Sequence, residues 1–175
     1  MPSLLTQLLN LPLISRIRRN HGLEHATIHV LSEDGPRTTL IGRADSRGFF
    51  LYGNVPTDVV DRAAHDALSK LQAGQHQLAV HPNCGTSLLT AALMASASAF
   101  FSILGVRRED RWRDRLARLP MAIFLTTMAL VAAQPIGLYA QRFLTTQGDP
   151  AGLKIVDVER ISEGNQTIHR VRTVG

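Results

Sequence analysis

The chain has 175 residues, enough for one domain of ordinary size or for a smaller domain joined to a membrane element. It carries 19 lysines and arginines against 14 aspartates and glutamates, a formal net charge of +5, and one cysteine. One cysteine excludes an intrachain disulfide and with it the disulfide-stapled class of small secreted domains. No nucleic-acid-binding motif accompanies the positive charge, so we expect no nucleic-acid partner.

Residues 1–19 combine leucines with a following basic cluster, RIRR. The apolar part is interrupted by polar residues and proline, is too short to span a bilayer, and lacks the flanking features of a signal peptide. In a helix four leucines share one face: Leu4, Leu5, Leu8 and Leu9. We interpret the segment as an amphipathic helix at the membrane interface, with an ordinary helix packed on the soluble domain as the equal alternative.

The segment NHGLEHATIHV, residues 20–30, places three histidines at four-residue spacing. On a helix, residues four apart lie on one face, so His21, His25 and His29 form a ladder. Glu24 flanks this ladder. Imidazole and carboxylate groups gathered on one helical face are typical of a transition-metal site.

Within this segment, HGLEH resembles the H-x-x-E-H motif of the inverzincin metallopeptidases. The resemblance implies that His21 and His25 bind zinc and that Glu24 is the general base that activates water. In that family a glutamate on a downstream helix supplies the third ligand. Here no glutamate occurs between Glu33 and Glu109, so the third ligand has to come from another residue type.

Residues 20–85 are predicted to form the first part of an α+β domain. SEDG ends the histidine-rich helix, TTLIGR and GFFLYG predict two strands, and ADSRG predicts the turn between them. VPTDVVDRAAHDALSKLQAG predicts a helix with Thr57 at its N-cap and Gly74 just past its end. QLAVHP predicts a further strand. The buried stripe of the predicted helix is Val60, Ala63, Ala64, Ala67, Leu68 and Leu71.

The segment HPNCGTS, residues 81–87, places a histidine and the single cysteine three residues apart at the start of an apolar run. A helix N-terminus favours the thiolate, which is a soft zinc ligand. We therefore expect a shared zinc site with candidate ligands His21, His25, His29, His81 and Cys84. Two alternatives stay open: a metal-free proton-handling or thiol site, and packing alone, with the cysteine a small buried apolar residue.

Residues 86–106 and 119–141 contain no charged residue, and each run, if helical, is about 30 Å long. We predict a transmembrane helical hairpin over residues 86–141, that is, a cell-membrane protein with two spans; the alternative is a pair of buried helices in a soluble protein. Two stripes of small residues favour close packing of the two helices: Ala91, Ala95 and Ala99, and Ala122, Thr126, Ala129, Ala133 and Gly137.

The connection between these runs, residues 107–118, carries six arginines and Trp112. We expect it to contact anionic lipid headgroups. The positive-inside rule would place it in the cytoplasm, yet the basic cluster at 16–19 lies one crossing away, so the sidedness stays open.

Residues 142–175 are predicted to complete the domain. TTQGDPAGL indicates a linker, and KIVDVERI and QTIHRVRTV, separated by SEGN, predict a β-hairpin. A lone hairpin is marginal in water, so we expect it to join the earlier strands in one mixed sheet. The predicted fold is therefore a small α+β domain split by a transmembrane hairpin.

The motifs HGLEHATIHVL, GR-D-RGF-LYG and LQAG followed by AVHPNCGT, together with the hairpin, resemble small bacterial integral membrane proteins of unknown function. The resemblance implies the membrane topology and brings no activity. We expect a zinc-binding membrane protein; if it is an enzyme, its reaction class is metal-dependent hydrolysis with Glu24 as base. The alternative is a non-catalytic membrane protein or complex subunit whose histidines and cysteine are structural; either form can meet a protein partner or a second copy through the hairpin.

Overall fold

The computed structural model describes residues 3–34, 39–104, 112–163 and 166–175. The chain divides into two compact units, one formed by Met1–His81 with Arg142–Gly175 and the other by Pro82–Gln141. The first unit is therefore built from two stretches of chain that are separated in sequence by the whole of the second.

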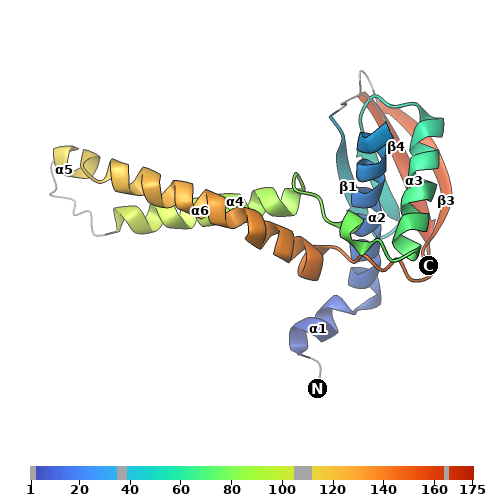
Figure 1. Ribbon diagram of the computed structural model, residues 1–175, viewed down its shortest axis with the longest axis horizontal. Coiled ribbons are helices and arrows are strands. Elements are labelled where there is room, and N and C mark those ends of the chain that lie inside the picture. Colours follow the sequence, from blue (N-terminus) through green and yellow to red (C-terminus); the bar gives the residue numbers. More distant parts are fainter. Residues whose placement is uncertain (1–2, 35–38, 105–111, 164–165) are drawn as a thin grey trace. The chain divides into compact units, whose positions relative to one another are not determined.

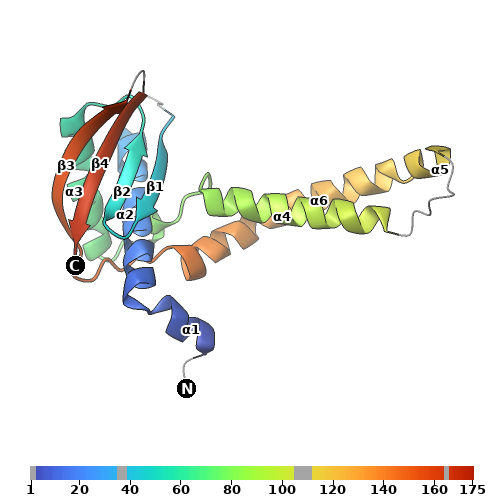
Figure 2. The same cartoon turned by 180° about the vertical axis from the view of Figure 1, so that it is seen from behind.

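The first unit is a two-layer α+β structure. Its helices are α1 (Leu4–Leu9), α2 (Pro12–Asp34), α3 (Thr57–Gln72) and the short 3-10 helix η1 (His76–Ala79), and its strands are β1 (Ile41–Asp45), β2 (Gly48–Tyr52), β3 (Lys154–Glu163) and β4 (Gln166–Val174). The strand order is β1-β2-β4-β3. Figures 1 and 2 show α2 and α3 on one face of this sheet.

The sheet confirms the predicted C-terminal hairpin and corrects the expected mixed pairing. β3 pairs with β4, and β4 pairs with β2, so the hairpin joins the N-terminal strands as predicted. All three strand pairs are antiparallel. Short connections join β1 to β2 and β3 to β4, which makes both of these pairs antiparallel. The remaining pair is also antiparallel because β4 runs opposite to β2.

The core lies between the sheet and the two long helices. The predicted stripe of α3 is confirmed, since all six of its residues are buried. It packs against Leu23 and Ala26 of α2 and against the inward side chains Phe49 and Leu51 of β2 and Val171 of β4. Alternation along β2 and β4 sends every second side chain into this core and leaves the other sheet face outside it.

Two local predictions in this unit are wrong. The segment QLAVHP is not a strand but begins as η1, and the carbonyls of Ala79 and Val80 accept hydrogen bonds from imidazoles instead of from a neighbouring strand. Helix α3 begins at Thr57 with Pro56 as its N-cap and no side-chain cap bond. The Thr57 hydroxyl instead lies 3.2 Å from Nε2 of His169 on β4, so a tertiary contact replaces the local cap.

The second unit is a helical hairpin of α4 (Gly85–Ile103) and α6 (Leu119–Ala140), with the short α5 (Trp112–Leu116) before α6. The predicted stripe of α6 faces α4: Ala133 and Gly137 are buried, and a Cβ on Gly137 would lie 3.0 Å from Ser87. On α4 the corresponding stripe is only partly as predicted, because Ala99 is exposed. Part of the predicted arginine-rich connection, residues 107–111, lies outside the described residues.

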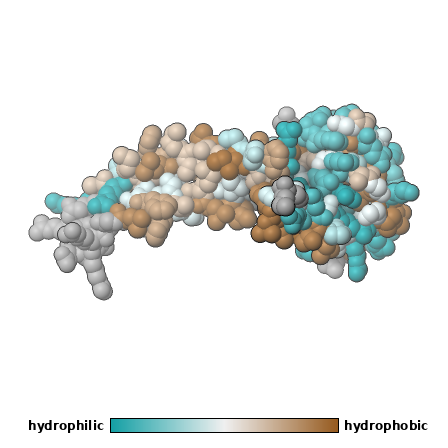
Figure 3. All heavy atoms as spheres, turned by 90° about the horizontal axis from the view of Figure 1, so that it is seen from below, coloured by the Kyte–Doolittle hydropathy of each residue, from teal (hydrophilic) through white to brown (hydrophobic). Residues whose placement is uncertain are grey.

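The outward surface of this hairpin is apolar. Figure 3 shows hydrophobic side chains gathered over α4 and α6. Both helices are long and apolar enough to cross a membrane, over Gly85–Ser102 and Leu119–Thr145. Large apolar side chains that are more than half exposed on the hairpin include Leu88, Leu89, Leu93, Phe100, Phe101, Ile123, Phe124 and Val131.

Helix α1 also presents apolar side chains. Leu4, Leu5 and Leu8 are exposed, at 75%, 53% and 47%. Leu9, the fourth leucine of the predicted face, is half-buried, and α1 contacts α2, so the choice between an interfacial and a packed helix stays a prediction.

Candidate metal centre

The first unit gathers four histidines. His21, His25 and His29 follow one another along α2, and His81 comes from the segment after η1. The ring centroids of His21 and His25 are 4.4 Å apart, those of His25 and His81 6.0 Å, and those of His29 and His81 5.1 Å. Two imidazoles that share a tetrahedral zinc ion have centroids roughly 5 Å apart, so these separations bracket the spacing of a zinc site.

Three of these imidazoles are oriented by backbone carbonyls. Nδ1 of His21 donates to the carbonyl of Thr145 at 2.9 Å, Nδ1 of His25 to that of Ala79 at 2.8 Å, and Nε2 of His29 to that of Val80 at 2.9 Å. A carbonyl only accepts, so the contacting ring nitrogen carries the hydrogen. Metal-ligating histidines commonly donate their other ring N–H to a backbone carbonyl in this way.

His21 and His25 are the closest pair. One ring nitrogen of each lies within 4.8 Å of the other. His25 is 2% exposed, whereas His21 is partly exposed. One buried and one accessible imidazole suit a site that water or a small ligand can reach from one side.

Glu24 lies beside this pair. Its carboxylate is 3.8 Å from Nε2 of His21, longer than a hydrogen bond. Ligand atoms on one tetrahedral zinc are roughly 3.4 Å apart, so the separation suits two groups that face the same cation. Glu24 is 3% exposed, and a buried carboxylate needs a cation or hydrogen-bond donors close by.

Two glycines make room for this arrangement. A Cβ on Gly42 of β1 would overlap the Glu24 carboxylate, and a Cβ on Gly22 of α2 would overlap the carbonyl oxygen of Gln147. Gly22 weakens α2 by about 1 kcal/mol relative to alanine, but it lets the segment after α6 approach the helix closely. Both glycines are therefore needed for the packing around the histidines and Glu24. The sequence next to each glycine gave no sign of this requirement.

Arg18 holds this same segment in place. Its guanidinium donates to the carbonyls of Phe143 at 3.1 Å and Thr146 at 3.0 Å, while the N–H of Gln147 donates to the carbonyl of Arg18 at 3.0 Å. Residues Gln141–Thr145 form a π-helical turn. Together these contacts present the Thr145 carbonyl to His21.

His81 is half-buried, and its pKa lies below the ordinary histidine value. The main cause is burial, and the charge of His29 acts in the same direction. Both effects disfavour protonation, so they keep His81 in the neutral form that a metal requires.

Cys84 belongs to the second unit and starts α4. It is buried, and its Sγ accepts a hydrogen bond from the N–H of Thr86 at 3.4 Å, which makes it the N-cap residue of α4. The structure therefore gives it a local role in the helix. Of the other histidines, His65 is exposed and bonded to Asp61, and His169 lies in the core beside Thr57.

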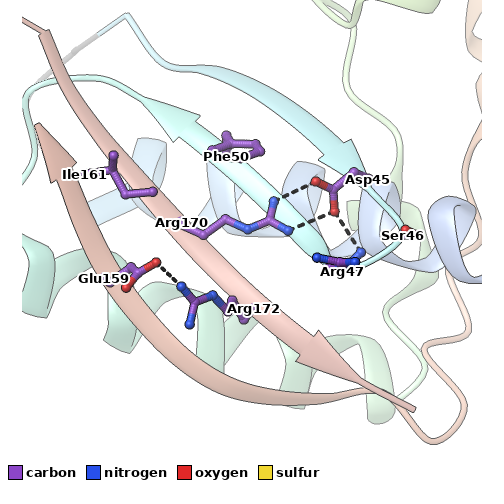
Figure 4. A pocket seen from close by; sticks show the side chains of 8 residues that line it. All are labelled: Asp45, Ser46, Arg47, Phe50, Glu159, Ile161, Arg170 and Arg172. Atoms are coloured by element: carbon purple, nitrogen blue, oxygen red, sulfur yellow. Dashed lines mark hydrogen bonds and ion pairs between the residues drawn. The ribbon is translucent and has the colours of Figure 1, made fainter. Parts of the chain in front are cut away.

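The open face of the sheet carries a second polar constellation, shown in Figure 4. It surrounds a pocket of about 530 Å³. Its lining residues are Asp45, Ser46, Arg47, Phe50, Glu159, Ile161, Arg170 and Arg172.

The pocket is organised around Arg170. The guanidinium lies 4.3 Å from the centroid of the Phe50 ring and donates two hydrogen bonds of 2.9 Å to Asp45. Arg172 pairs with Glu159 and Asp157. Both arginines are thus neutralised by carboxylates of the same face, so the arrangement ties strands together rather than presenting positive charge.

The pKa of the Asp45 carboxyl is lowered by these neighbours. Burial tends to raise the pKa of its carboxyl, but hydrogen bonds from Arg170 and Arg47 and the charges of Arg170 and Arg43 outweigh burial and hold the pKa below its usual value.

The fold and the clustered histidines define an α+β protein with an apolar helical hairpin and a candidate metal centre. Residues 16–158 match the model of a domain of unknown function, DUF6391, and the chain belongs to that family. It is similar to an uncharacterised protein of Picosynechococcus sp. (strain ATCC 27264 / PCC 7002 / PR-6), with 32% identity over 169 residues that cover 89% of this chain and 78% of the relative. No solved structure matches the chain.

Proposed function

We propose that this chain is an integral membrane protein with a zinc site in its α+β unit, centred on His21 and His25. The observation that carries the proposal is that a ring nitrogen of His21 lies within 4.8 Å of one of His25, while the Nδ1 atoms of both rings bond to backbone carbonyls. Imidazole nitrogen is a preferred zinc ligand.

The remaining ligands come from the segment that begins at His81. The His81 ring is 6.0 Å from that of His25 and is held neutral by burial. Cys84 follows His81 by three residues, so chain connectivity alone keeps its Cα within about 11 Å of the Cα of His81. His29 contacts His81 and is the second choice as a ligand.

Glu24 decides whether the site is catalytic. A bound zinc ion would supply an activated water for attack on a carbonyl or phosphoryl group. The Glu24 carboxylate, 3.8 Å from Nε2 of His21, is placed to take the proton of such a water. The proposed reaction class is metal-dependent hydrolysis.

Membrane insertion is supported by the second unit. Among the described residues of its two long helices, the buried ones are Ala133 and Gly137, whereas large apolar side chains are exposed on the outer faces. Exposing apolar surface to water costs about 25 cal/mol per Å², whereas a lipid environment removes this cost.

The ligand set is tested by titrating detergent-purified, metal-free protein with zinc against a chromophoric chelator. We expect one high-affinity equivalent, lost in His25→Ala and weakened at least tenfold in Cys84→Ser or His81→Ala. The matched control is His65→Ala, which should bind as the wild type does. Circular dichroism of each variant separates lost binding from lost folding, and wild-type affinity in a folded His25→Ala variant would contradict the proposal.

The catalytic role is tested by Glu24→Gln. The amide keeps the size of the side chain, so zinc binding should persist while zinc-dependent hydrolysis of ester or peptide substrates falls by at least 100-fold. A variant that loses zinc affinity to the same extent as His25→Ala would make Glu24 a ligand instead of a base.

A second candidate function is structural. The hydrogen bonds from His21, His25 and His29 to carbonyls join α2 to η1 and to the segment after α6 without any metal. In that case the wild type binds no zinc, and the histidine substitutions lower its stability without changing any metal-dependent property.

A further inference from the structure

We infer that two copies of this chain associate in the membrane through a face of α6 centred on Gln134. The inference rests on the membrane insertion proposed above and is independent of the zinc site. Its starting point is an exposed amide in the middle of an apolar span.

Gln134 lies two residues past the middle of the candidate span Leu119–Thr145. It is exposed on α6, and no other described group forms a hydrogen bond with it. Two residues correspond to about 3 Å along a helix, so the amide lies near the centre of the hydrocarbon. The two ends of the span are about 22 Å and about 16 Å away along the helix, beyond the reach of a glutamine side chain.

An amide without a partner is costly in this position. Moving it from water to a medium that cannot hydrogen-bond costs several kcal/mol, and lipid tails offer neither donors nor acceptors. The inward face of α6, which packs against α4, consists of small residues and does not include Gln134. The amide is therefore placed to hydrogen-bond with another molecule.

A second copy supplies that partner by symmetry. An amide carries both donors and an acceptor, so it pairs with an identical amide across a twofold axis. Copies inserted with the same topology are related by an axis along the membrane normal, which brings equal residues together at equal depth. Gln134 of one copy therefore meets the partner's Gln134.

The residues around Gln134 form a continuous packing face. Ile123, Leu130 and Leu138 are exposed at 65%, 44% and 37%, and Thr127 is exposed one heptad before Gln134. The steps from Ile123 through Thr127, Leu130 and Gln134 are four, three and four residues, the spacing of a seam in a left-handed helix pair, and Leu138 lies one helical turn further on. This face is distinct from the stripe through Ala133 and Gly137 that packs on α4.

The test uses the full chain, carrying donor or acceptor fluorophores at the N-terminus, in phosphatidylcholine vesicles over a range of protein-to-lipid ratios. We expect energy transfer to report a dimer, about tenfold weaker in Gln134→Leu and largely retained in Gln134→Asn. The control Ser96→Leu replaces an exposed polar residue of α4 and should associate as the wild type does.

Alkaline carbonate extraction of the same membranes separates the two proposals. A chain that remains in the membrane but is monomeric, or that dimerises equally well as Gln134→Leu, overturns the dimer alone. A chain that carbonate extracts overturns membrane insertion and, with it, the dimer. If Gln134→Leu and Ser96→Leu reduced energy transfer equally, the assignment of the dimer interface to this face of α6 would also be overturned.

Discussion

At the scale of single residues, the position of the Glu24 carboxylate depends on the absence of a side chain at Gly42. A Cβ at this position would overlap the carboxylate, and Glu24 is held against β1 by the packing of α2 on the sheet. The pattern HxxEH singled out Glu24 in the sequence, but the glycine opposite its carboxylate comes from another element and carries no local signal.

We therefore expect Gly42→Ala to lower the free energy of unfolding by about 1–3 kcal/mol and to weaken zinc binding, since the carboxylate has to move. Gly152→Ala is the matched control, because a Cβ there meets nothing within 4 Å. Chemical denaturation of both variants measures the difference. Equal stability of the two variants would show that Glu24 can move without cost.

A second residue-scale prediction concerns His169, which is fully buried on β4 with Nδ1 unbonded among the described atoms. Burial first, and then the charge of Arg160, lower its pKa below the ordinary value of 6.5. The unfolded chain therefore binds a proton at a higher pH than the folded chain does, so the stability that neutral His169 contributes is lost as the pH falls below about 6.5.

We expect thermal unfolding to show falling stability between pH 7 and pH 5, with a shallower fall in His169→Gln, which removes the titrating ring. The measurement is a melting curve by circular dichroism at each pH, in the same buffer system and detergent. An unchanged slope in the variant would assign the acid sensitivity to another group.

At the scale of secondary-structure elements, Asp45 and Arg170 join the end of β1 to the middle of β4. The Arg170 side chain is 7% exposed and that of Asp45 36%, so the guanidinium has little access to water. Removing the carboxylate leaves a buried cation without its partner, a larger loss than breaking a surface ion pair.

We expect Asp45→Ala to cost about 2–4 kcal/mol, less than for a fully buried pair because Asp45 is partly exposed. Asp61→Ala, at an exposed site on α3, should cost under about 0.5 kcal/mol. Denaturant midpoints compared at equal slope give both values. A cost for Asp45→Ala no larger than that of the control would mean that Phe50 and water suffice to hold Arg170.

Helical periodicity in the sequence predicted which faces of α3 and α6 are buried, but it did not predict the structure of QLAVHP. The stripe of α3 and the inward stripe of α6 followed from helical spacing, because burial of one face repeats every three to four residues. The segment QLAVHP is short and apolar at its centre, which favours a strand, yet the carbonyls of Ala79 and Val80 accept hydrogen bonds from His25 and His29 of α2. Contacts between residues more than 50 positions apart decide that segment, and no local pattern contains them.

At the scale of the whole molecule, the histidines of α2 connect two stretches of chain that are distant in sequence. His21 bonds to Thr145 after α6, and His25 bonds to Ala79 before α4. The rings of His21, His25, His29 and His81 lie close together within the first unit, and their role as metal ligands with Cys84 stays a prediction. The carbonyls that orient these imidazoles could not be predicted, because every residue has a backbone carbonyl and the sequence does not show which one accepts the hydrogen bond.

The measurement that tests the zinc site most directly is the metal content of the protein purified in detergent without chelators or a histidine tag. We predict about one zinc per chain in the wild type and in His65→Ala, and none in a folded His21→Ala/His25→Ala variant. A wild-type protein that contains no zinc, and that binds none when zinc is added, would contradict the account and leave the histidines as structural hydrogen-bond donors.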